Sequence, residues 1–218
     1  MSDEPTRAGV HQGQPVLAAG APLAEARAAL VMVHGRGASA EDILSFSDEL
    51  ARPGLALLAP QASGHTWYPY SFLAPLDANE PYLSSALAQL DAVVARVVAA
   101  GIPTERIVLL GFSQGACLML EYAARHAQRY GGLVGWSGGL IGPDGTPRVY
   151  AGALARTPVF LGCSTNDPHV PEARVNHTAE VLRGLGAVVD ERIYPGLGHT
   201  VNQDELDAAR ALVTAVAA

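Results

Sequence analysis

The sequence contains little cysteine and little charge. Two of its 218 residues are cysteines, Cys117 and Cys163, and two thiols do not make a disulfide framework. Because both lie in segments that are predicted to be buried, we interpret them as small hydrophobic core residues. Charged residues make up 16% of the chain and hydrophobic residues 49%, which excludes a disordered chain. The length predicts a single domain over residues 1–218, with 1–13 as a flexible N-terminal segment.

Basic residues are also scarce. The 14 Lys and Arg residues are outnumbered by 21 Asp and Glu residues, which gives a formal net charge of −7. Nucleic acid repels such a protein, and an anionic membrane face attracts it little, so neither is an expected partner. The sequence has no uninterrupted apolar run of about 18 residues, and its start lacks the basic and apolar regions of a signal peptide. We therefore expect a cytoplasmic protein with no stable membrane association.

Six short apolar runs are spread along the chain and are predicted to be strands. They are Ala29–Val33, Leu55–Ala59, Ile107–Leu110, Leu133–Trp136, Val159–Gly162 and Val188–Tyr194. Most are continuously apolar, as expected of strands that are covered on both faces of a sheet. The last run contains three charged residues, which favours a place nearer the sheet edge.

Helical patterns alternate with these runs. Apolar residues recur at three- and four-residue spacing in Pro81–Ala100, an alanine-rich helix is expected over Asp204–Ala217, and Ser39 precedes two acidic residues that favour a helix start. Such alternation predicts an α/β fold: a mostly parallel central sheet with helices on both faces. In such sheets, ligands bind at the carboxyl ends of the strands, so chemically active residues are expected just after each apolar run.

A nucleophile motif follows the third run. The sequence Gly111-Phe112-Ser113-Gln114-Gly115 lies between a predicted strand and a predicted helix, which is the context that G-x-S-x-G requires. The two glycines remove side chains that would collide in a sharp turn, and the turn lifts the serine hydroxyl out of the sheet. We therefore interpret Ser113 as a nucleophile rather than an ordinary turn serine.

A serine nucleophile needs a base, and seven histidines compete for that role. His199 follows Tyr194–Gly198, a glycine-rich loop between the last strand and the last helix, and is the preferred candidate. His65 and His169 also lie in carboxyl-end loops, so their positions leave them open. His11 falls in the predicted flexible start.

The base in turn needs an orienting carboxylate. Asp167 lies in the loop after the fifth run, and the order Ser113, Asp167, His199 matches the serine, acid, histidine order of α/β-hydrolases. The rival aspartates lie inside a strand, in a turn and at a helix start: Asp190, Asp144 and Asp204. We therefore prefer Asp167.

A tetrahedral intermediate also needs two backbone donors for its oxyanion. Gln114 follows the nucleophile and opens the next helix. Arg36 is the third residue of His34-Gly35-Arg36-Gly37, a glycine-rich loop after the first run, and we assign its N–H as the second donor. His34 is interpreted as a residue that braces this loop.

These motifs together resemble the phospholipase/carboxylesterase family of the α/β-hydrolase fold, which includes small bacterial carboxylesterases and acyl-protein thioesterases. The resemblance covers about Ala29 to His199. Its markers are His34-Gly35-Arg36-Gly37, Trp67-Tyr68, Gly111-Phe112-Ser113-Gln114-Gly115, Asp167 with Val170-Pro171, and Gly198-His199. It implies a serine hydrolase of small-molecule carboxylic esters or thioesters that uses no metal or organic cofactor. A thioesterase, a lysophospholipase and a non-catalytic binding module on the same fold are the alternatives.

Two positions depart from the family pattern. The family often has leucine where this chain has Arg36, and the usual Trp-(Phe/Tyr)-Asp segment reads Trp67-Tyr68-Pro69 here, without the acid. Both changes fall where substrate is expected, so a preference for long-chain lysophospholipids or palmitoylated proteins does not follow from the resemblance.

The size of the chain bears on the substrate. The predicted elements use nearly all residues, so no cap domain is expected and the site should be open. Aromatic residues gather in the long carboxyl-end loop, which is either a packed loop or a pocket wall. The pocket candidates are Trp67, Tyr68, Tyr70 and Val170. We expect small or short-to-medium-chain esters as substrates, and the sequence leaves a homodimer open.

Overall fold

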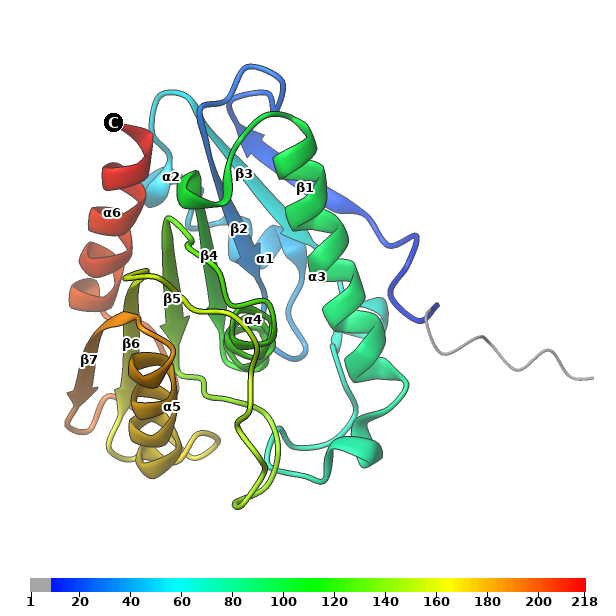
Figure 1. The fold of residues 1–218 in the computed structure, drawn as a ribbon, viewed down its shortest axis with the longest axis vertical. Coiled ribbons are helices and arrows are strands. Elements are labelled where there is room, and N and C mark those ends of the chain that lie inside the picture. Colours follow the sequence, from blue (N-terminus) through cyan, green and yellow to red (C-terminus); the bar gives the residue numbers. More distant parts are fainter. Residues whose placement is uncertain (1–8) are drawn as a thin grey trace, which may run out of the picture.

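The structure is a computed structural model that describes residues 9–218. Seven strands form one sheet in the order β1-β3-β2-β4-β5-β6-β7 (Figure 1). The strands are β1 Val16–Gly20, β2 Ala28–Val33, β3 Leu55–Pro60, β4 Ile107–Phe112, β5 Gly132–Trp136, β6 Pro158–Ser164 and β7 Val188–Tyr194. β1 pairs antiparallel with β3, and the other neighbours pair in parallel. The predicted mostly parallel α/β fold is confirmed.

All six predicted strands are present, each within two residues of its predicted bounds. β2 to β5 are buried along nearly their whole length, which matches their continuous apolar character. β7 lies at one edge of the sheet, as its charged residues indicated. The other edge strand, β1, was not predicted, because its sequence Val-Leu-Ala-Ala-Gly is short and lacks the β-branched, alternating pattern of a typical strand.

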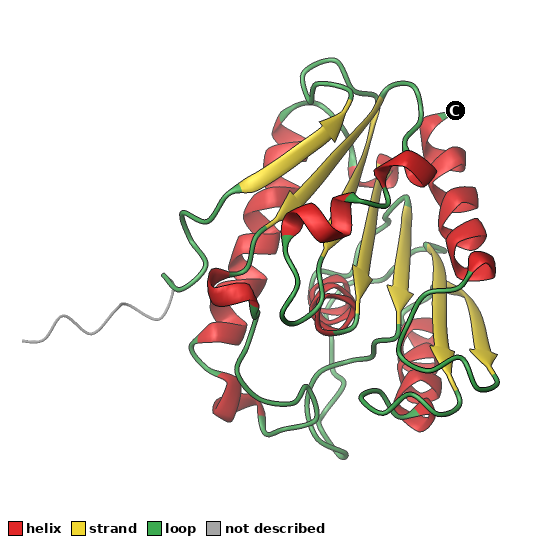
Figure 2. Cartoon of the chain, turned by 180° about the vertical axis from the view of Figure 1, so that it is seen from behind, coloured by secondary structure: helices red, strands yellow, loops and turns green. Residues whose placement is uncertain are grey.

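Within residues 9–218, six α-helices cover the two faces of the sheet (Figure 2). They are α1 Ala40–Leu44, α2 Ser47–Leu50, α3 Tyr82–Ala99, α4 Gln114–Arg125, α5 Glu172–Gly184 and α6 Gln203–Ala217. One core cluster joins alternate strand residues to α3, α4 and α5, and a second joins the remaining strand residues to α1, α2 and α6. Helices therefore pack on both faces, as predicted. Within residues 9–218 no separate cap domain covers the sheet edge.

The helix starts follow from capping side chains. Ser39 accepts a hydrogen bond from the N–H of Asp42, whose carboxylate accepts one from the N–H of Ser39 in return. Asn202 and Glu205 form the same reciprocal pair at the start of α6. These capping boxes satisfy N–H groups that have no partner within the helix.

Among residues 9–218, one helix has the length and composition of a membrane span. α3, Tyr82–Ala99, is long and apolar enough to cross a bilayer by those two measures, although its sequence includes Asp91 and Arg96. Half of the stretch is buried, and the buried side chains belong to the core that α3 shares with α4 and the sheet.

The predicted flexible start requires a correction. Residues 1–8 lie outside the described residues, but His11 is fully buried. One ring nitrogen of His11 lies 2.9 Å from the carbonyl oxygen of Trp67, and the other accepts a hydrogen bond from the N–H of Ser63 at 3.0 Å. Burial lowers the pKa of this imidazole, although the carbonyl of Trp67 acts in the opposite direction. A single histidine among polar residues gives no sequence signal for such an anchor.

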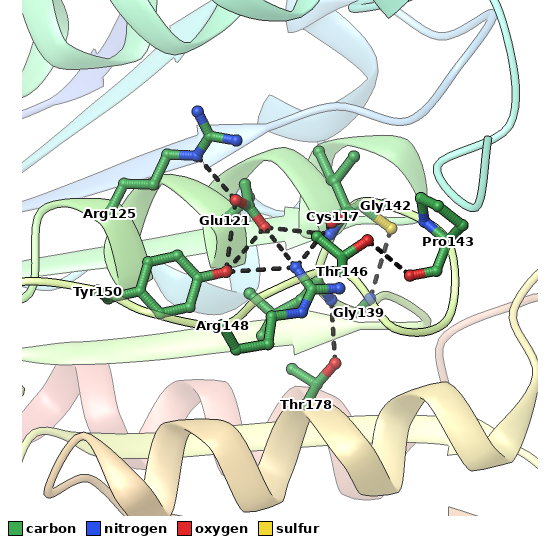
Figure 3. A network of polar contacts seen from close by, with 12 residues as sticks. Cys117, Glu121, Arg125, Gly139, Gly142, Pro143, Thr146, Arg148, Tyr150 and Thr178 are labelled. Atoms are coloured by element: carbon green, nitrogen blue, oxygen red, sulfur yellow. Dashed lines mark hydrogen bonds and ion pairs between the residues drawn. The ribbon is translucent and has the colours of Figure 1, made fainter. Parts of the chain in front are cut away.

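A polar network ties the long connection between β5 and β6 to α4 (Figure 3). Its centre is the Glu121 carboxylate, which is almost fully buried and accepts hydrogen bonds from Arg125, Arg148, the Tyr150 hydroxyl and the Ile141 N–H. Arg148 also donates to the carbonyl oxygen of Ile141 at 2.7 Å. The carboxylate therefore holds an irregular loop, which has no strand or helix of its own, against a central helix.

Candidate active site

A sharp turn at Ser113 joins β4 to α4. Ser113 has φ 55° and ψ −122°, a strained conformation for a residue with a side chain. The two flanking glycines explain how the turn fits. A Cβ on Gly111 would lie 2.5 Å from the carbonyl oxygen of Gly115, and a Cβ on Gly115 would lie 2.2 Å from that of Val33. Strand and helix thus approach each other more closely than a residue with a Cβ at either position would permit.

The Ser113 hydroxyl, His199 and Asp167 form a continuous chain. The Nε2 atom of His199 lies 2.8 Å from the Oγ of Ser113, and its Nδ1 lies 2.7 Å from the Oδ2 of Asp167. The three residues follow β4, β7 and β6, so three strand ends supply them. The structure therefore brings together the three residues that the sequence order singled out, as expected where the carboxyl ends of parallel strands meet.

The Asp167 side chain is fully buried, whereas the His199 side chain is 18% exposed. The second oxygen of Asp167 accepts hydrogen bonds from the N–H groups of His169 and Val170, at 2.8 and 3.0 Å. Burial acts to raise the pKa of this carboxyl, but the hydrogen bonds from His199 and these two N–H groups outweigh it and hold the pKa below its ordinary value. Asp167 is thus fixed as a carboxylate that faces the imidazole.

The rival candidates lie elsewhere. His65 is exposed and contacts the carbonyl oxygen of Ala38. His169 lies beside the site, with its ring centroid 4.8 Å from that of His199, but the Asp167 carboxylate contacts its backbone rather than its ring. The rival aspartates are paired with arginines: Asp144 with Arg174, and Asp190 and Asp204 with Arg192.

The two residues assigned as backbone donors flank the nucleophile. Gln114 is the first residue of α4, where the N–H groups have no partner within the helix. The Arg36 loop lies close by, because a Cβ on Gly35 would lie 3.4 Å from the Cβ of Ser113. His34 braces this loop from behind: its Nε2 accepts a hydrogen bond from the N–H of Ala62 at 3.1 Å.

The side chains of these same two residues hold one segment in common. Arg36 donates to the carbonyl oxygens of Tyr68, Pro69 and Tyr70, at 2.9, 2.7 and 2.6 Å. Gln114 donates to the carbonyl oxygen of Tyr68 at 2.8 Å and accepts from the N–H of Trp67 at 2.9 Å. The Tyr68 carbonyl therefore links both loops. The two departures from the family pattern, at positions 36 and 69, contact each other.

A cavity of about 430 Å³ opens beside Ser113. Of the predicted pocket residues, Tyr68 and Val170 line it. Trp67 does not, because its side chain is buried in the core and its indole N–H donates to the carbonyl oxygen of His34. Tyr70 does not line it either and is 60% exposed. Other residues that line this cavity were not among the predicted pocket candidates: Ser71, Phe72, Phe112, Cys117 and His169.

A second cavity, of about 310 Å³, lies on the other side of His199. The two cavities share Gly35, Ala38, Phe112 and His199. The second is otherwise lined by α1 and by the residues after His199, and it includes the carboxylate of Asp42. The imidazole therefore lies between a cavity that contains the serine and one that contains an acidic residue.

Metal ligands do not gather at this site. Across residues 9–218, no group of three or more His, Cys, Asp or Glu side chains is placed to hold a metal ion. The arrangement is instead that of a hydroxyl, an imidazole and a carboxylate in hydrogen-bonding sequence, which is the arrangement that activates a serine for acyl transfer.

Comparisons with known proteins identify the family of the chain. The model of a family described as Phospholipase/Carboxylesterase matches residues 16–216. The chain belongs to this family. The predicted resemblance is thus confirmed, and the protein is a hydrolase of the α/β-hydrolase fold in a family whose named members include thioesterases and carboxylesterases.

Individual members of the family show how similar the chain is. The crystal structure of a phospholipase/carboxylesterase from Dyadobacter fermentans is 43% identical, with a TM-score of 0.90 over 95% of this chain and 99% of that one. Acyl-protein thioesterase 1 of Gibberella zeae is 35% identical over 127 residues, which is 56% of this chain and about half, 52%, of the relative. The same enzyme of Debaryomyces hansenii is 26% identical over 88% of this chain and 92% of the relative.

Proposed function

We propose that the protein is a serine carboxylesterase that hydrolyses small or short-to-medium-chain carboxylic esters through an acyl-enzyme. The observation that carries the proposal is the unbroken chain from the Ser113 hydroxyl through His199 to the buried Asp167 carboxylate, with distances of 2.8 and 2.7 Å. A serine hydroxyl is a weak nucleophile at neutral pH, and this arrangement supplies the base that it needs.

Each residue of the chain has one role. His199 takes the proton of Ser113 as the hydroxyl oxygen attacks the ester carbonyl, and it returns the proton to the departing alcohol. Asp167 keeps the imidazole in the tautomer whose Nε2 is free to accept that proton, and its negative charge stabilises the imidazolium that forms. Water then repeats the sequence on the acyl-enzyme and releases the acid.

The negative oxygen of the tetrahedral intermediate is bound by the N–H groups of Arg36 and Gln114. Both residues are held in place by their own side chains, which donate hydrogen bonds to the Tyr68 carbonyl oxygen. Donors that are already in place need not reorganise when the charge develops, which is why such sites lower the barrier to acyl transfer.

The two cavities hold different parts of the substrate. The larger contains Ser113 and both oxyanion residues, so it holds the acyl group. The smaller is also lined by His199, which must protonate the departing alcohol, but it lacks Ser113 and both oxyanion residues, so we assign the alcohol group to it. We assign a short or medium acyl chain to the larger cavity, whose volume is about 430 Å³. With 4-nitrophenyl esters of acetate to palmitate, kcat/KM should fall beyond medium chains, and a steady rise would contradict this assignment.

Labelling with a fluorophosphonate tests the nucleophile. The protein should take up one equivalent of the probe at Ser113, and Ser113→Ala should abolish both labelling and ester hydrolysis while the protein remains folded by circular dichroism. Ser84→Ala removes an exposed serine from the first turn of α3 and is the matched control. Retained hydrolysis in Ser113→Ala would overturn the proposal.

A thioesterase is the second candidate, favoured by the relatives named acyl-protein thioesterase 1. The same three residues would perform that reaction. Oxygen esters and thioesters of one acyl group, compared by kcat/KM, separate the two activities. A cytoplasmic location, the absence of a cofactor and the oligomeric state stay predictions.

A further inference from the structure

Arg36 brings a permanent positive charge to the cavity that holds Ser113. The residues that line this cavity include no aspartate or glutamate, although acidic residues outnumber basic ones in the chain. Among residues 9–218, no carboxylate forms an ion pair with Arg36. Its partners are three backbone carbonyl groups, which polarise toward the guanidinium but do not neutralise it.

The position of Pro69 explains why the charge is unpaired. The family pattern has an acid where this chain has Pro69, and an acid there could pair with an arginine at position 36. In this chain Pro69 offers only its carbonyl oxygen, at 2.7 Å from the Nη1 atom of Arg36. A guanidinium has five N–H groups, and the three carbonyls use three of them. Two N–H groups therefore remain for another acceptor.

The same carbonyls hold the guanidinium in place. An arginine side chain that is fixed by three hydrogen bonds has already lost its rotamer freedom, so binding an anion costs less conformational entropy than it would for a free side chain. The same residue, whose N–H is a proposed oxyanion donor, therefore also lines the cavity with a fixed charge.

Tyr68 is a second polar residue of this cavity, but its hydroxyl is buried beside the Cys117 thiol. Burial raises the pKa of this phenol well above its ordinary value, so it stays a protonated donor. Almost none of its oxygen is exposed, so a ligand does not reach it, and Arg36 is the charged group that the cavity offers to a substrate.

We propose that the larger cavity, which contains Ser113, recognises esters whose acyl chain ends in a carboxylate, through the Arg36 guanidinium. This inference rests on the proposed esterase function and adds the substrate class to it. The smaller cavity is lined by Asp42, whose carboxylate disfavours an anionic alcohol group there. The charge is therefore expected on the acyl side of the ester.

Pairs of esters with matched shape test the proposal. Monomethyl glutarate and its amide counterpart, methyl 4-carbamoylbutanoate, differ only in charge at the end of the acyl chain. Because a hydrogen bond to a charged group contributes about 1.5–3 kcal/mol, kcat/KM should be roughly tenfold or more higher for the acid. The preference should shrink as salt is added. Acetylglycolate and its amide place the same charge on the alcohol side and should show no such preference.

Variants at position 36 separate charge recognition from the bracing of the loop. Arg36→Lys keeps the charge and loses most of the carbonyl contacts, so the acid-to-amide ratio should persist even if both rates fall. Arg36→Gln keeps a donor for the carbonyls and loses the charge, so the ratio should fall toward one.

The outcomes are distinct from those for the esterase function. A wild-type ratio near one, a ratio that is unchanged in Arg36→Gln, or failure to hydrolyse the acid while neutral 4-nitrophenyl esters are turned over would each overturn the charge inference and leave the esterase intact. Absence of Ser113 labelling and of all ester hydrolysis would overturn the esterase function itself.

Discussion

Gly115 lies so close to Val33 that a Cβ at position 115 would stand 2.2 Å from the Val33 carbonyl oxygen. This contact joins the start of α4 to the end of β2, the strand that leads into the Arg36 loop. The turn at Ser113 and the Arg36 loop are therefore in direct contact through their backbones. Their relative position is possible only because the residue at position 115 is a glycine, which has no side chain.

Gly115→Ala should destabilise the protein. The new methyl group meets backbone oxygens of Val33 and His34, which cannot rotate away, so strand and helix must separate. Overpacking of this kind costs about 1–3 kcal/mol, and urea unfolding should show it as a lower midpoint. Gly184→Ala is the control, because a Cβ there meets nothing within 4 Å and alanine favours the helix. Equal stability of the two variants would contradict the packing argument.

Asp167→Asn should lower kcat by about 10⁴ with little loss of folding. An asparagine can donate to the Nδ1 atom of His199, which would place the ring proton on Nε2 and leave that atom unable to accept the serine proton. Steady-state kinetics with a neutral 4-nitrophenyl ester measure the loss. Asp48→Asn, which changes an exposed acid on α2, should keep wild-type kcat. A loss of less than tenfold in Asp167→Asn would remove Asp167 from its proposed role.

The sheet and the three strand-end residues could be predicted because each depends on local pattern. A continuous apolar run predicts a buried strand, and in a parallel sheet the residues that follow such runs meet at one edge. To choose Ser113, Asp167 and His199 among the strand-end residues, the G-x-S-x-G motif and the serine, acid, histidine order of α/β-hydrolases were also needed. β1 gave no such signal, since Val16–Gly20 is short and only partly buried.

The contacts between loops could not be predicted in this way. Nothing in the spacing of Arg36 indicates that its side chain binds the carbonyls of residues 68–70, or that Trp67 is turned into the core. Cys117 was correctly predicted to be buried. It also lines the cavity that contains Ser113, because the first turns of α4 lie beneath Ser113. Such relationships arise between segments that are distant in the sequence, and periodicity reports only on near neighbours.

Glu205 should make stability fall as the pH rises. Its side chain is buried beside Gly162, and burial raises its pKa to about 7, against an ordinary value near 4.5, although the Asn202 N–H acts to lower it. Between these values the folded protein binds a proton that the unfolded chain has lost, so the free energy of unfolding declines from about pH 4.5 to 7.

Glu205→Gln removes this titration and can still accept the Asn202 N–H. Relative to wild type, the variant should therefore gain roughly 1–3 kcal/mol of unfolding free energy between pH 5 and pH 8, measured by urea titration at both values. Glu25→Gln changes an exposed acid and should track wild type at both. A difference between Glu205→Gln and wild type that stays constant with pH would show that Glu205 does not titrate in this range.

Glu121→Gln should be the most destabilising of the single changes considered. It leaves the Arg148 guanidinium, whose side chain is only 9% exposed, without the carboxylate that compensates its charge. Breaking a buried ion pair from one side costs about 3–5 kcal/mol. The double variant Glu121→Gln, Arg148→Met removes both charges and should recover part of that loss, which a double-mutant cycle by thermal unfolding would measure. Glu180→Gln, an exposed acid on α5, should stay within about 0.5 kcal/mol of wild type. If the losses in Glu121→Gln and Arg148→Met simply add, the pair is not coupled and the loop is held by its other contacts.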